Sequence, residues 1–170
     1  MKRFLGWLAL AGVVIGLDQW SKLAVLARFA EYESLKVTEY FNLVLVYNPG
    51  SAFGLLADQS GWQRWLFFTL AILICSYLLR LTWQHRNEII QPAAFALIIG
   101  GAIANNLIDR PLYGAVVDFL DFHYLGHHYP AFNLADSAIF LGVCLIAGLS
   151  IQAQLREWRL KKNQTENSSK

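Results

Sequence analysis

The sequence predicts an all-α membrane protein built from four transmembrane helices, with a small extracytoplasmic antiparallel β-sheet and a short interfacial helix. The first observation is composition: 56% of the 170 residues are hydrophobic and only 15% are charged, a balance well outside that of soluble domains. The second is that four windows of roughly 20 mostly apolar residues, each long enough to cross a bilayer, follow one another along the chain. We therefore expect one integral-membrane domain over residues 1–160 and a polar, disordered cytoplasmic tail over residues 161–170.

The four apolar windows contain few charges. The first is interrupted by Asp18 and Lys22, the third carries no charge, and the fourth carries only Asp136. Because Lys2 and Arg3 precede the first window, a cleavable signal peptide is the alternative there, but no small-residue cleavage site follows it. We therefore interpret all four windows as membrane spans. They are residues 4–27, 62–81, 89–108 and 131–155.

Lysine and arginine predict the orientation of these spans, because basic residues near the ends of a span stay on the cytoplasmic side of the membrane. With both termini cytoplasmic, that side holds 9 basic and 3 acidic residues, and the opposite side holds 5 basic and 9 acidic residues. We therefore expect a multi-pass protein with both termini inside and its acidic residues gathered at the outer face. The net charge of +2 gives no indication of nucleic-acid binding.

Two external connections, residues 28–61 and 109–130, join the spans. The first contains "SLKVTEYFNLVLVYNPGSAFGLL", whose alternation around Leu35, Val37 and Glu39 predicts strands and whose "NPG" predicts a turn. We expect these strands to form the small antiparallel sheet on the membrane surface. The following "ADQSGWQRW", residues 57–65, predicts the short interfacial helix, with its tryptophans at headgroup level.

Three of the spans bring polar residues to the same outer level. Asp18 and Lys22 have the i, i+4 spacing of an ion pair on one helical face, which either makes the end of the first span tolerable or supports a site. Asn106, Asp109 and Arg110 have i, i+3 and i+4 spacings, so we expect them on one face. The alternative is that Asp109 and Arg110 mark a helix end in water. Convergence from separate segments favours a site.

Two further carboxylates complete the candidate cluster. Asn133 and Asp136 repeat the i, i+3 relation at the start of the fourth span, where helix capping alone is an alternative role for Asp136. Asp118 lies in "AVVDFL", flanked by apolar residues on both sides, so it is not a typical exposed loop charge. Two carboxylates in a partly dry cavity cannot both ionise easily, which yields one base and one acid at neutral pH. Such a pair can hydrolyse a peptide, because the base takes a proton from water while the acid polarises the carbonyl.

Other chemistries have weaker support in the sequence. His123 and His127 have the i, i+4 spacing of a zinc helix, but they lack the intervening glutamate, and Gly126 predicts a loop. Ser51 and Ser137 lack the signature of an activated nucleophile. Intramembrane acids also suit ion transport, yet the inner halves of the spans offer few polar residues. We therefore expect neither a metal nor a cofactor.

Five short blocks occur in order along the chain: "LDQWSK" (17–22), "NPGSAF" (48–53), "GAIANNLIDR" (101–110), "VVDF" (116–119) and "FNLADSAI" (132–139). Together with the four-span layout, this pattern resembles lipoprotein signal peptidase, the type II signal peptidase of bacteria. The resemblance implies four transmembrane helices with a small extracytoplasmic sheet. It also implies an aspartic intramembrane endopeptidase of the bacterial inner membrane, which cuts signal peptides from prolipoproteins just before a diacylglyceryl-modified cysteine. The expected partners are these substrates and membrane lipid, and the sequence indicates no obligate protein partner.

The same resemblance implies roles for individual residues. Asp118 from "VVDF" and Asp136 from "FNLAD" match the family's catalytic pair. The family usually has glycine directly before its motif asparagine, where this chain has Asn105, and we assign the family position to Asn106 because of its spacing to Asp109 and Arg110. The residues that match the polar positions shaping the site and binding substrate are Asp18, Lys22, Asn48, Asn106, Asp109, Arg110 and Asn133.

Overall fold

The computed structural model describes residues 1–50 and 61–168. Within these residues, four helical segments are long and apolar enough to cross a membrane, namely Lys2–Leu26, Gln63–Gln84, Ile90–Tyr113 and Leu134–Gln164. They coincide with the four predicted windows, so the predicted four-helix membrane fold is confirmed. The first and second spans are α1 (Lys2–Leu26) and α2 (Gln63–Gln84), and the fourth belongs to α5 (Leu134–Ser168). The third is composite, made of α3 (Ile90–Ala102), the π-helix η2 (Ile103–Asp109) and α4 (Arg110–Tyr113).

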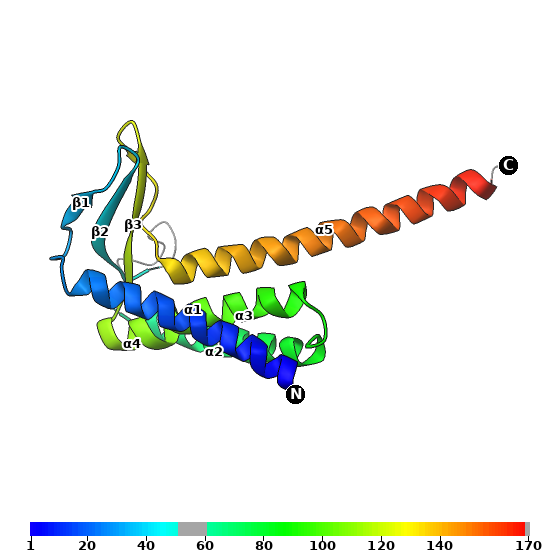
Figure 1. Cartoon of the computed structure of the whole chain (residues 1–170), viewed down its shortest axis with the longest axis horizontal. Helices are drawn as coiled ribbons and strands as arrows, with labels where there is room; N and C mark the ends of the chain where they lie inside the picture. Colours follow the sequence, from blue (N-terminus) through cyan, green and yellow to red (C-terminus); the bar gives the residue numbers. More distant parts are fainter. Residues whose placement is uncertain (51–60, 169–170) are drawn as a thin grey trace.

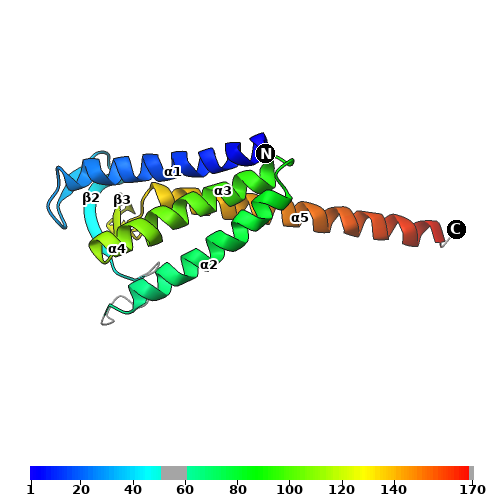
Figure 2. The ribbon, with the colours of Figure 1, turned by 90° about the horizontal axis from the view of Figure 1, so that it is seen from below.

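The helix α3 is the centre of the bundle. It packs against α1, α2 and α5, and Figure 2 shows its ribbon between those of α1 and α2. The share of buried residues, taken over an 18-residue window of each span, is 56% for the third span and 11–22% for the other three. Glycine makes this close packing possible: a Cβ added to Gly100 would lie 2.8 Å from the Ala11 carbonyl oxygen, and one added to Gly101 would lie 2.5 Å from the Ala135 carbonyl oxygen.

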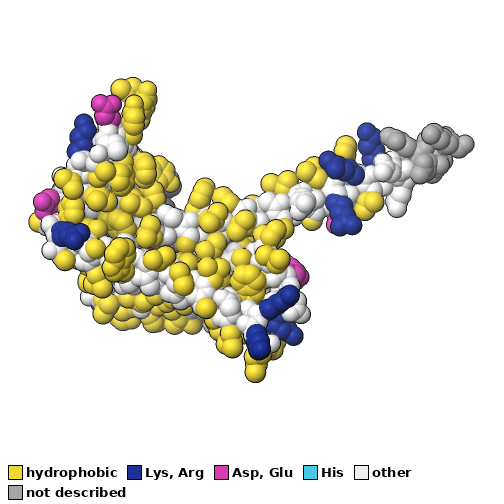
Figure 3. Space-filling view, in the orientation of Figure 1, with side chains coloured by type: hydrophobic (Ala, Val, Ile, Leu, Met, Phe, Trp, Pro, Cys, Tyr) yellow, Lys and Arg dark blue, Asp and Glu magenta, His cyan; other side chains and the backbone are white. Residues whose placement is uncertain are grey.

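Side-chain types separate along the bundle. In Figure 3, hydrophobic side chains cover most of the visible bundle, whereas Lys and Arg gather near the N-terminus and on the far part of α5, with others beside the sheet. Large apolar side chains such as Trp20, Leu73 and Phe140 are exposed on three different helices. A helix that is apolar on its outward faces as well as its inward face is expected where lipid is the solvent. The protein is therefore a multi-pass membrane protein.

An antiparallel sheet lies at the end of the bundle opposite the N-terminus (Figure 1). Among the described residues its order is β1 (Ser34–Lys36), β2 (Phe41–Asn48), β3 (Val116–Tyr124) and β4 (His127–His128). The strands β1 and β2 come from the first connection, as predicted. The strands β3 and β4 come from the second connection, where the sequence analysis identified none. The register of β2 with β3 places Val46 opposite Asp118, so the sheet carries one of the candidate acids.

Two local predictions come out differently. The predicted disordered tail is wrong for residues 161–168, because α5 continues to Ser168 and extends well past the bundle (Figure 1). The reason is local, since no glycine or proline follows Gly148 and the segment is rich in Gln, Leu, Arg and Lys, which favour helix. Residues 57–60 of the predicted interfacial helix lie outside the described residues. Of its residues 61–65, the last three already belong to α2, which begins at Gln63.

Candidate active site

Asp118 is held from two sides. It is one of four consecutive buried residues at the start of β3, and only 2% of it is exposed. Its Oδ1 accepts a hydrogen bond from Asn133 Nδ2 at 2.7 Å, and its Oδ2 accepts one from Asn48 Nδ2 at 3.2 Å. The Asn48 amide is itself oriented, because its Oδ1 accepts the backbone N–H of Gly50 at 3.1 Å. The end of β2 and the start of α5 therefore fix the carboxyl group of Asp118.

Asp136 lies in the first turn of α5. Its Oδ2 accepts the backbone N–H of Asn133 at 3.2 Å, and Asn133 Oδ1 accepts the backbone N–H of Asp136 at 2.8 Å. These reciprocal bonds cap the helix, which is the role that the sequence left open for Asp136. Its Oδ1 also accepts a hydrogen bond from Asn105 Nδ2 at 2.8 Å. Asp136 is therefore tied to the third span as well as to its own helix.

The two carboxyl groups line one cavity of about 190 Å³. Asn133 donates to Asp118 through its side chain and to Asp136 through its backbone, so both acids lie beside the same residue. A water molecule occupies about 30 Å³ of liquid volume, so the cavity has room for several. The other described residues that line it are Asn48, Tyr129, Pro130, Ala131 and Phe132.

The surroundings of Asp118 favour its protonated form. Burial, and after it the neighbouring Asp136 carboxylate, raise the pKa of Asp118 from 3.8 to about 8. Hydrogen bonds from Asn48 and Asn133 and the charge of Lys22 act in the opposite direction without cancelling the shift. The protonated form of Asp118 is therefore favoured at neutral pH.

A buried ion cluster lies beneath the two acids. Lys22 Nζ lies 2.7 Å from Asp18 Oδ2 and 2.7 Å from Asp109 Oδ2, and these side chains are at most 1% exposed. Asp18 Oδ1 accepts the backbone N–H of Ala135 at 2.8 Å, and Asp109 Oδ2 accepts that of Val117 at 3.1 Å. Ala135 and Val117 directly precede Asp136 and Asp118 in the chain. The cluster therefore positions the backbone next to both acids and is more than a self-satisfied pair within α1.

Arg110 fastens the end of β2 to the bundle. Its Nη1 donates to the Pro49 carbonyl oxygen at 3.0 Å and its Nη2 to that of Gly50 at 2.5 Å. Its Nε donates to Asn106 Oδ1 at 3.0 Å, and its guanidinium carbon lies 4.4 Å from the centre of the Phe67 ring. Asp109 is 0% exposed and Arg110 is 4% exposed, so the alternative of a helix end in water is wrong.

The third span presents Asn105, rather than Asn106, to the acids. Asn105 is 4% exposed and contacts Lys22, Asn133 and Asp136, whereas the side chain of Asn106 bonds Ala102 and Arg110. The expected shared face therefore holds for Asn106 and Arg110, which bond each other, but not for Asp109, which faces Lys22 together with Asn105. The physical reason is that η2 is a π-helix with more residues per turn than an α-helix. The family spacing assigned the site role to Asn106, and Asn105 was noted only as a residue that stands where the family usually has glycine. Its polar side chain next to Asn106, in a mostly apolar span, was the signal.

Gln19 is a second residue that the sequence analysis did not select. Its Nε2 donates to Asp109 Oδ1 at 2.8 Å, so both oxygens of Asp109 have partners on α1. Gln19 stands between Asp18 and Lys22 in the chain, within the block "LDQWSK". A polar residue inside a span next to two charged ones is the signal that could have identified it.

The histidines of the β3–β4 hairpin lie apart from this cluster. His128 Nδ1 is 2.8 Å from Asp121 Oδ1, and Asn42 Nδ2 donates to Asp121 Oδ2 at 2.8 Å. Leu125 and Gly126, both with positive φ, form the turn between the two strands, so His123 and His127 are not on a helix. Within residues 1–50 and 61–168, no group of three or more His, Cys, Asp or Glu side chains could hold a metal.

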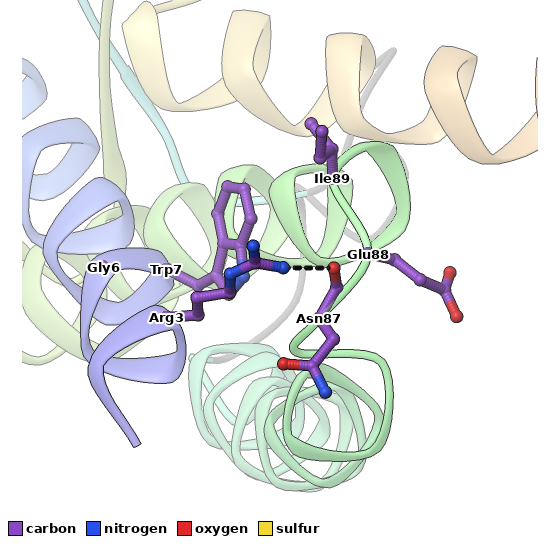
Figure 4. Close-up of a pocket in the computed structure, with 6 residues that line it drawn as sticks. All are labelled: Arg3, Gly6, Trp7, Asn87, Glu88 and Ile89. Atoms are coloured by element: carbon purple, nitrogen blue, oxygen red, sulfur yellow. Dashed lines mark hydrogen bonds between the residues drawn. The ribbon is translucent and has the colours of Figure 1, made fainter.

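A second cavity, of about 440 Å³, lies at the opposite end of the bundle. It is lined by Arg3, Gly6 and Trp7 of α1 and by residues 87–89 (Figure 4). Arg3 Nη1 donates to the Asn87 carbonyl oxygen at 2.8 Å, which ties α1 to the turn between α2 and α3. The lining offers a single acid, Glu88, so it lacks the paired carboxyl groups of the first cavity.

Comparison with known proteins agrees with this geometry. A family described as "Signal peptidase (SPase) II" matches residues 10–152. A lipoprotein signal peptidase from Azoarcus sp. (strain BH72) is 58% identical over 157 residues, which cover 92% of this chain and 86% of that protein. One from Burkholderia vietnamiensis (strain G4 / LMG 22486) is 52% identical over 143 residues, covering 82% of this chain and 84% of that protein.

Solved structures share the fold. A bacterial membrane enzyme determined by the in meso method at 2.3 Å resolution is similar with a TM-score of 0.78 and 29% identity, covering 88% of this chain and 89% of that one. Another, determined at 1.9 Å resolution, has a TM-score of 0.73 and 30% identity, covering 84% of this chain and 90% of that one. With two acids at one cavity and a family match over most of its length, this chain belongs to the signal peptidase II family of membrane proteases.

Proposed function

We propose that this protein is an intramembrane aspartic endopeptidase that removes signal peptides from diacylglyceryl-modified prolipoproteins by cutting just before the lipidated cysteine. Its family and the lipoprotein signal peptidases among its relatives support this reaction. The observation that carries the chemistry is that Asp118 and Asp136 line one cavity and both bond to Asn133. They are the proposed catalytic pair of a single protease domain over residues 1–160.

In the first step, a water molecule in the cavity attacks the carbonyl carbon of the scissile peptide bond. Asp136, ionised, takes a proton from this water, and Asp118, protonated, donates its proton to the carbonyl oxygen. The pKa of about 8 for Asp118 supports its assignment as the acid. The product is a tetrahedral diol, and the two carboxyl groups have exchanged their protonation states.

In the second step, the diol collapses and the carbon–nitrogen bond breaks. Asp136 gives its proton to the leaving nitrogen, and Asp118 takes a proton from one hydroxyl group as the new carboxyl forms. Both acids return to their starting states, so the pair is ready for another cycle. No nucleophilic side chain and no cofactor take part.

The remaining site residues hold the pair in position and shape the substrate's path. Asn48 and Asn133 orient the Asp118 carboxyl group directly. Arg110 fixes the residues after Asn48 by bonding to the Pro49 and Gly50 carbonyl oxygens. The full set proposed for site support and substrate binding is Asp18, Lys22, Asn48, Asn106, Asp109, Arg110 and Asn133.

We place the protein in the bacterial inner membrane with both termini cytoplasmic and the active site near the extracytoplasmic face. The N-terminus and the far end of α5 both lie away from the sheet (Figure 1), and Lys and Arg gather there (Figure 3). This distribution supports the proposed orientation, because basic residues stay on the cytoplasmic side. A lipid-anchored substrate would then reach the site from within the membrane, and membrane lipid is its other partner.

Substitution of either acid tests the proposal. Asp118→Asn and Asp136→Asn keep side-chain size but cannot exchange the protons that both steps need. Each variant should lose cleavage of a lipid-modified precursor in detergent while remaining folded and inserted. Asp121→Asn is the matched control, because Asp121 pairs with His128 outside the cavity. Full activity in either of the first two variants would refute the assignment.

A further inference from the structure

Asn105 joins the buried cation to one of the two acids. Its Oδ1 accepts a hydrogen bond from Lys22 Nζ at 2.6 Å, and its Nδ2 donates to Asp136 Oδ1 at 2.8 Å. Both bonds are long-range in sequence, linking α1, η2 and α5. The side chain is 4% exposed and does not line the cavity. Asn105 therefore bonds Asp136 from the side away from the cavity, where substrate has no access.

The direction of the Asn105 amide follows from its partners. An ammonium group is a donor only, so the atom of Asn105 that faces Lys22 must be the oxygen. The NH₂ group is then on the other side and faces Asp136 Oδ1. An NH₂ group has no lone pair available to accept a proton from a carboxylic acid. Because Lys22 fixes the orientation of the Asn105 amide, Asp136 Oδ1 can only accept a hydrogen bond from Asn105.

The second oxygen of Asp136 is constrained in the same way. Its partner is the backbone N–H of Asn133, which is a donor that cannot be reversed. Both oxygens of Asp136 therefore face donors whose direction is set by neighbouring groups. Hydrogen bonds of this kind favour the charged form of a carboxyl group. The ionisable groups on the elements around Asp136 are Asp18 and Lys22 of α1, Asp109 of η2, Arg110 of α4 and Asp118 of β3.

We propose that Asn105 is a positioning residue that passes the influence of the Lys22 cation to Asp136 and so selects Asp136 as the base of the catalytic pair. This inference rests on the proposed function and adds a specific role to a residue outside the cavity. Without Asn105, Lys22 keeps its two carboxylate partners but loses its direct path to Asp136. Among residues 1–50 and 61–168, the N–H of Asn133 is then the one remaining donor to the Asp136 carboxyl group. The preference for Asp136, rather than Asp118, as the ionised member of the pair is then smaller.

The test compares two substitutions in the full-length protein in detergent. Asn105→Ala removes both bonds. Asn105→Asp keeps an oxygen for Lys22, which preserves packing of the cluster, but places a second oxygen against Asp136. The matched control is Asn87→Ala, which removes an exposed amide at the opposite end of the bundle. Initial rates of cleavage of a lipid-modified precursor are measured across pH and substrate concentration.

For Asn105→Ala we expect kcat at neutral pH to fall about tenfold, as for loss of a hydrogen bond to a charged group. The acidic limb of the pH–rate profile should move to higher pH by about one unit, because ionised Asp136 has lost a donor. KM should stay within about twofold, since Asn105 does not line the cavity. Asn105→Asp should lose more activity than Asn105→Ala, because it adds an acceptor next to an acceptor.

The outcomes separate this inference from the proposed function. If wild-type protein cleaves the precursor but both Asn105 variants keep its kcat and pH profile, the role of Asn105 is refuted. A fall in kcat with an unmoved acidic limb also refutes it, because that result describes general damage to the fold. If the wild-type protein itself fails to cleave, or Asp118→Asn remains active, the proposed function is what fails.

Discussion

Replacing Lys22 with methionine removes a cation that three buried groups share. Methionine matches the length of the lysine stem, so the substitution deletes the charge and its bonds while leaving most of the packing. The lost interactions are ion pairs of 2.7 Å to Asp18 and to Asp109 and the 2.6 Å hydrogen bond to Asn105. Both carboxylates are 0% exposed, so each would be left as a buried charge without its cation. Removing one partner from a buried pair costs about 3–5 kcal/mol.

We therefore expect Lys22→Met to lower the free energy of unfolding by at least about 3 kcal/mol. The measurement is unfolding of the detergent-solubilised protein by a denaturing detergent, followed by circular dichroism. Lys36→Met is the matched control, because Lys36 is exposed on β1 and its replacement should change stability by less than about 0.5 kcal/mol. Adding Asp109→Asn to Lys22→Met should recover part of the loss, since one uncompensated charge is then gone. A Lys22→Met protein as stable as wild type would refute the reasoning.

Three further predictions concern other parts of the structure. Gly101→Ala places a Cβ 2.5 Å from the Ala135 carbonyl oxygen and should lower the free energy of unfolding by about 2 kcal/mol, whereas Gly12→Ala, with nothing within 4 Å, should be neutral or slightly stabilising; equal effects would contradict the packing of α3 on α5. Arg110→Lys cannot contact the Pro49 and Gly50 carbonyl oxygens and Asn106 together, so cleavage should fall about tenfold, and an unchanged rate would show that this anchor is dispensable. Because folding raises the pKa of Asp118 to about 8, the folded protein keeps a proton that the unfolded chain releases near pH 4. Stability should therefore fall as pH rises between these values, by up to about 1.4 kcal/mol per pH unit, and Asp118→Asn should remove this slope in unfolding measured at several pH values; parallel slopes in the two proteins would count against the shifted pKa.

The spans were predictable because hydropathy is a property of short windows. The bilayer sets the length of a spanning helix, so four apolar windows identify four helices without knowledge of their packing. The acids were also predictable, since Asp18 and Asp136 are conspicuous in apolar surroundings. Their meeting at one level followed from the order of the spans. The apolar windows could not predict which polar atoms of different spans would form hydrogen bonds with one another.

The strand β3 shows why part of the site was not predictable. Its sequence "VVDFLDFHY" has no simple alternation, because four consecutive residues from Val116 are buried, and pairing with β2 decides its conformation. Asn105 shows a second reason. A π-helix changes which residues share a face, and nothing in the local spacing signals one. Both depend on contacts between residues far apart in the chain.

The bond from the Ala135 N–H to Asp18 can form only late in synthesis, because it joins the first membrane helix to α5. The two residues are separated by 117 positions, so α1 enters the membrane long before α5 has been synthesised. During that interval Asp18 has Lys22 available one turn away on its own helix, and the pair neutralises itself. The i, i+4 spacing therefore gives Asp18 a partner within its own helix, and Asp109 and Ala135 add further bonds to the same two side chains when the later helices arrive. The cavity lined by Asp118 and Asp136 is completed only when α5 has been inserted.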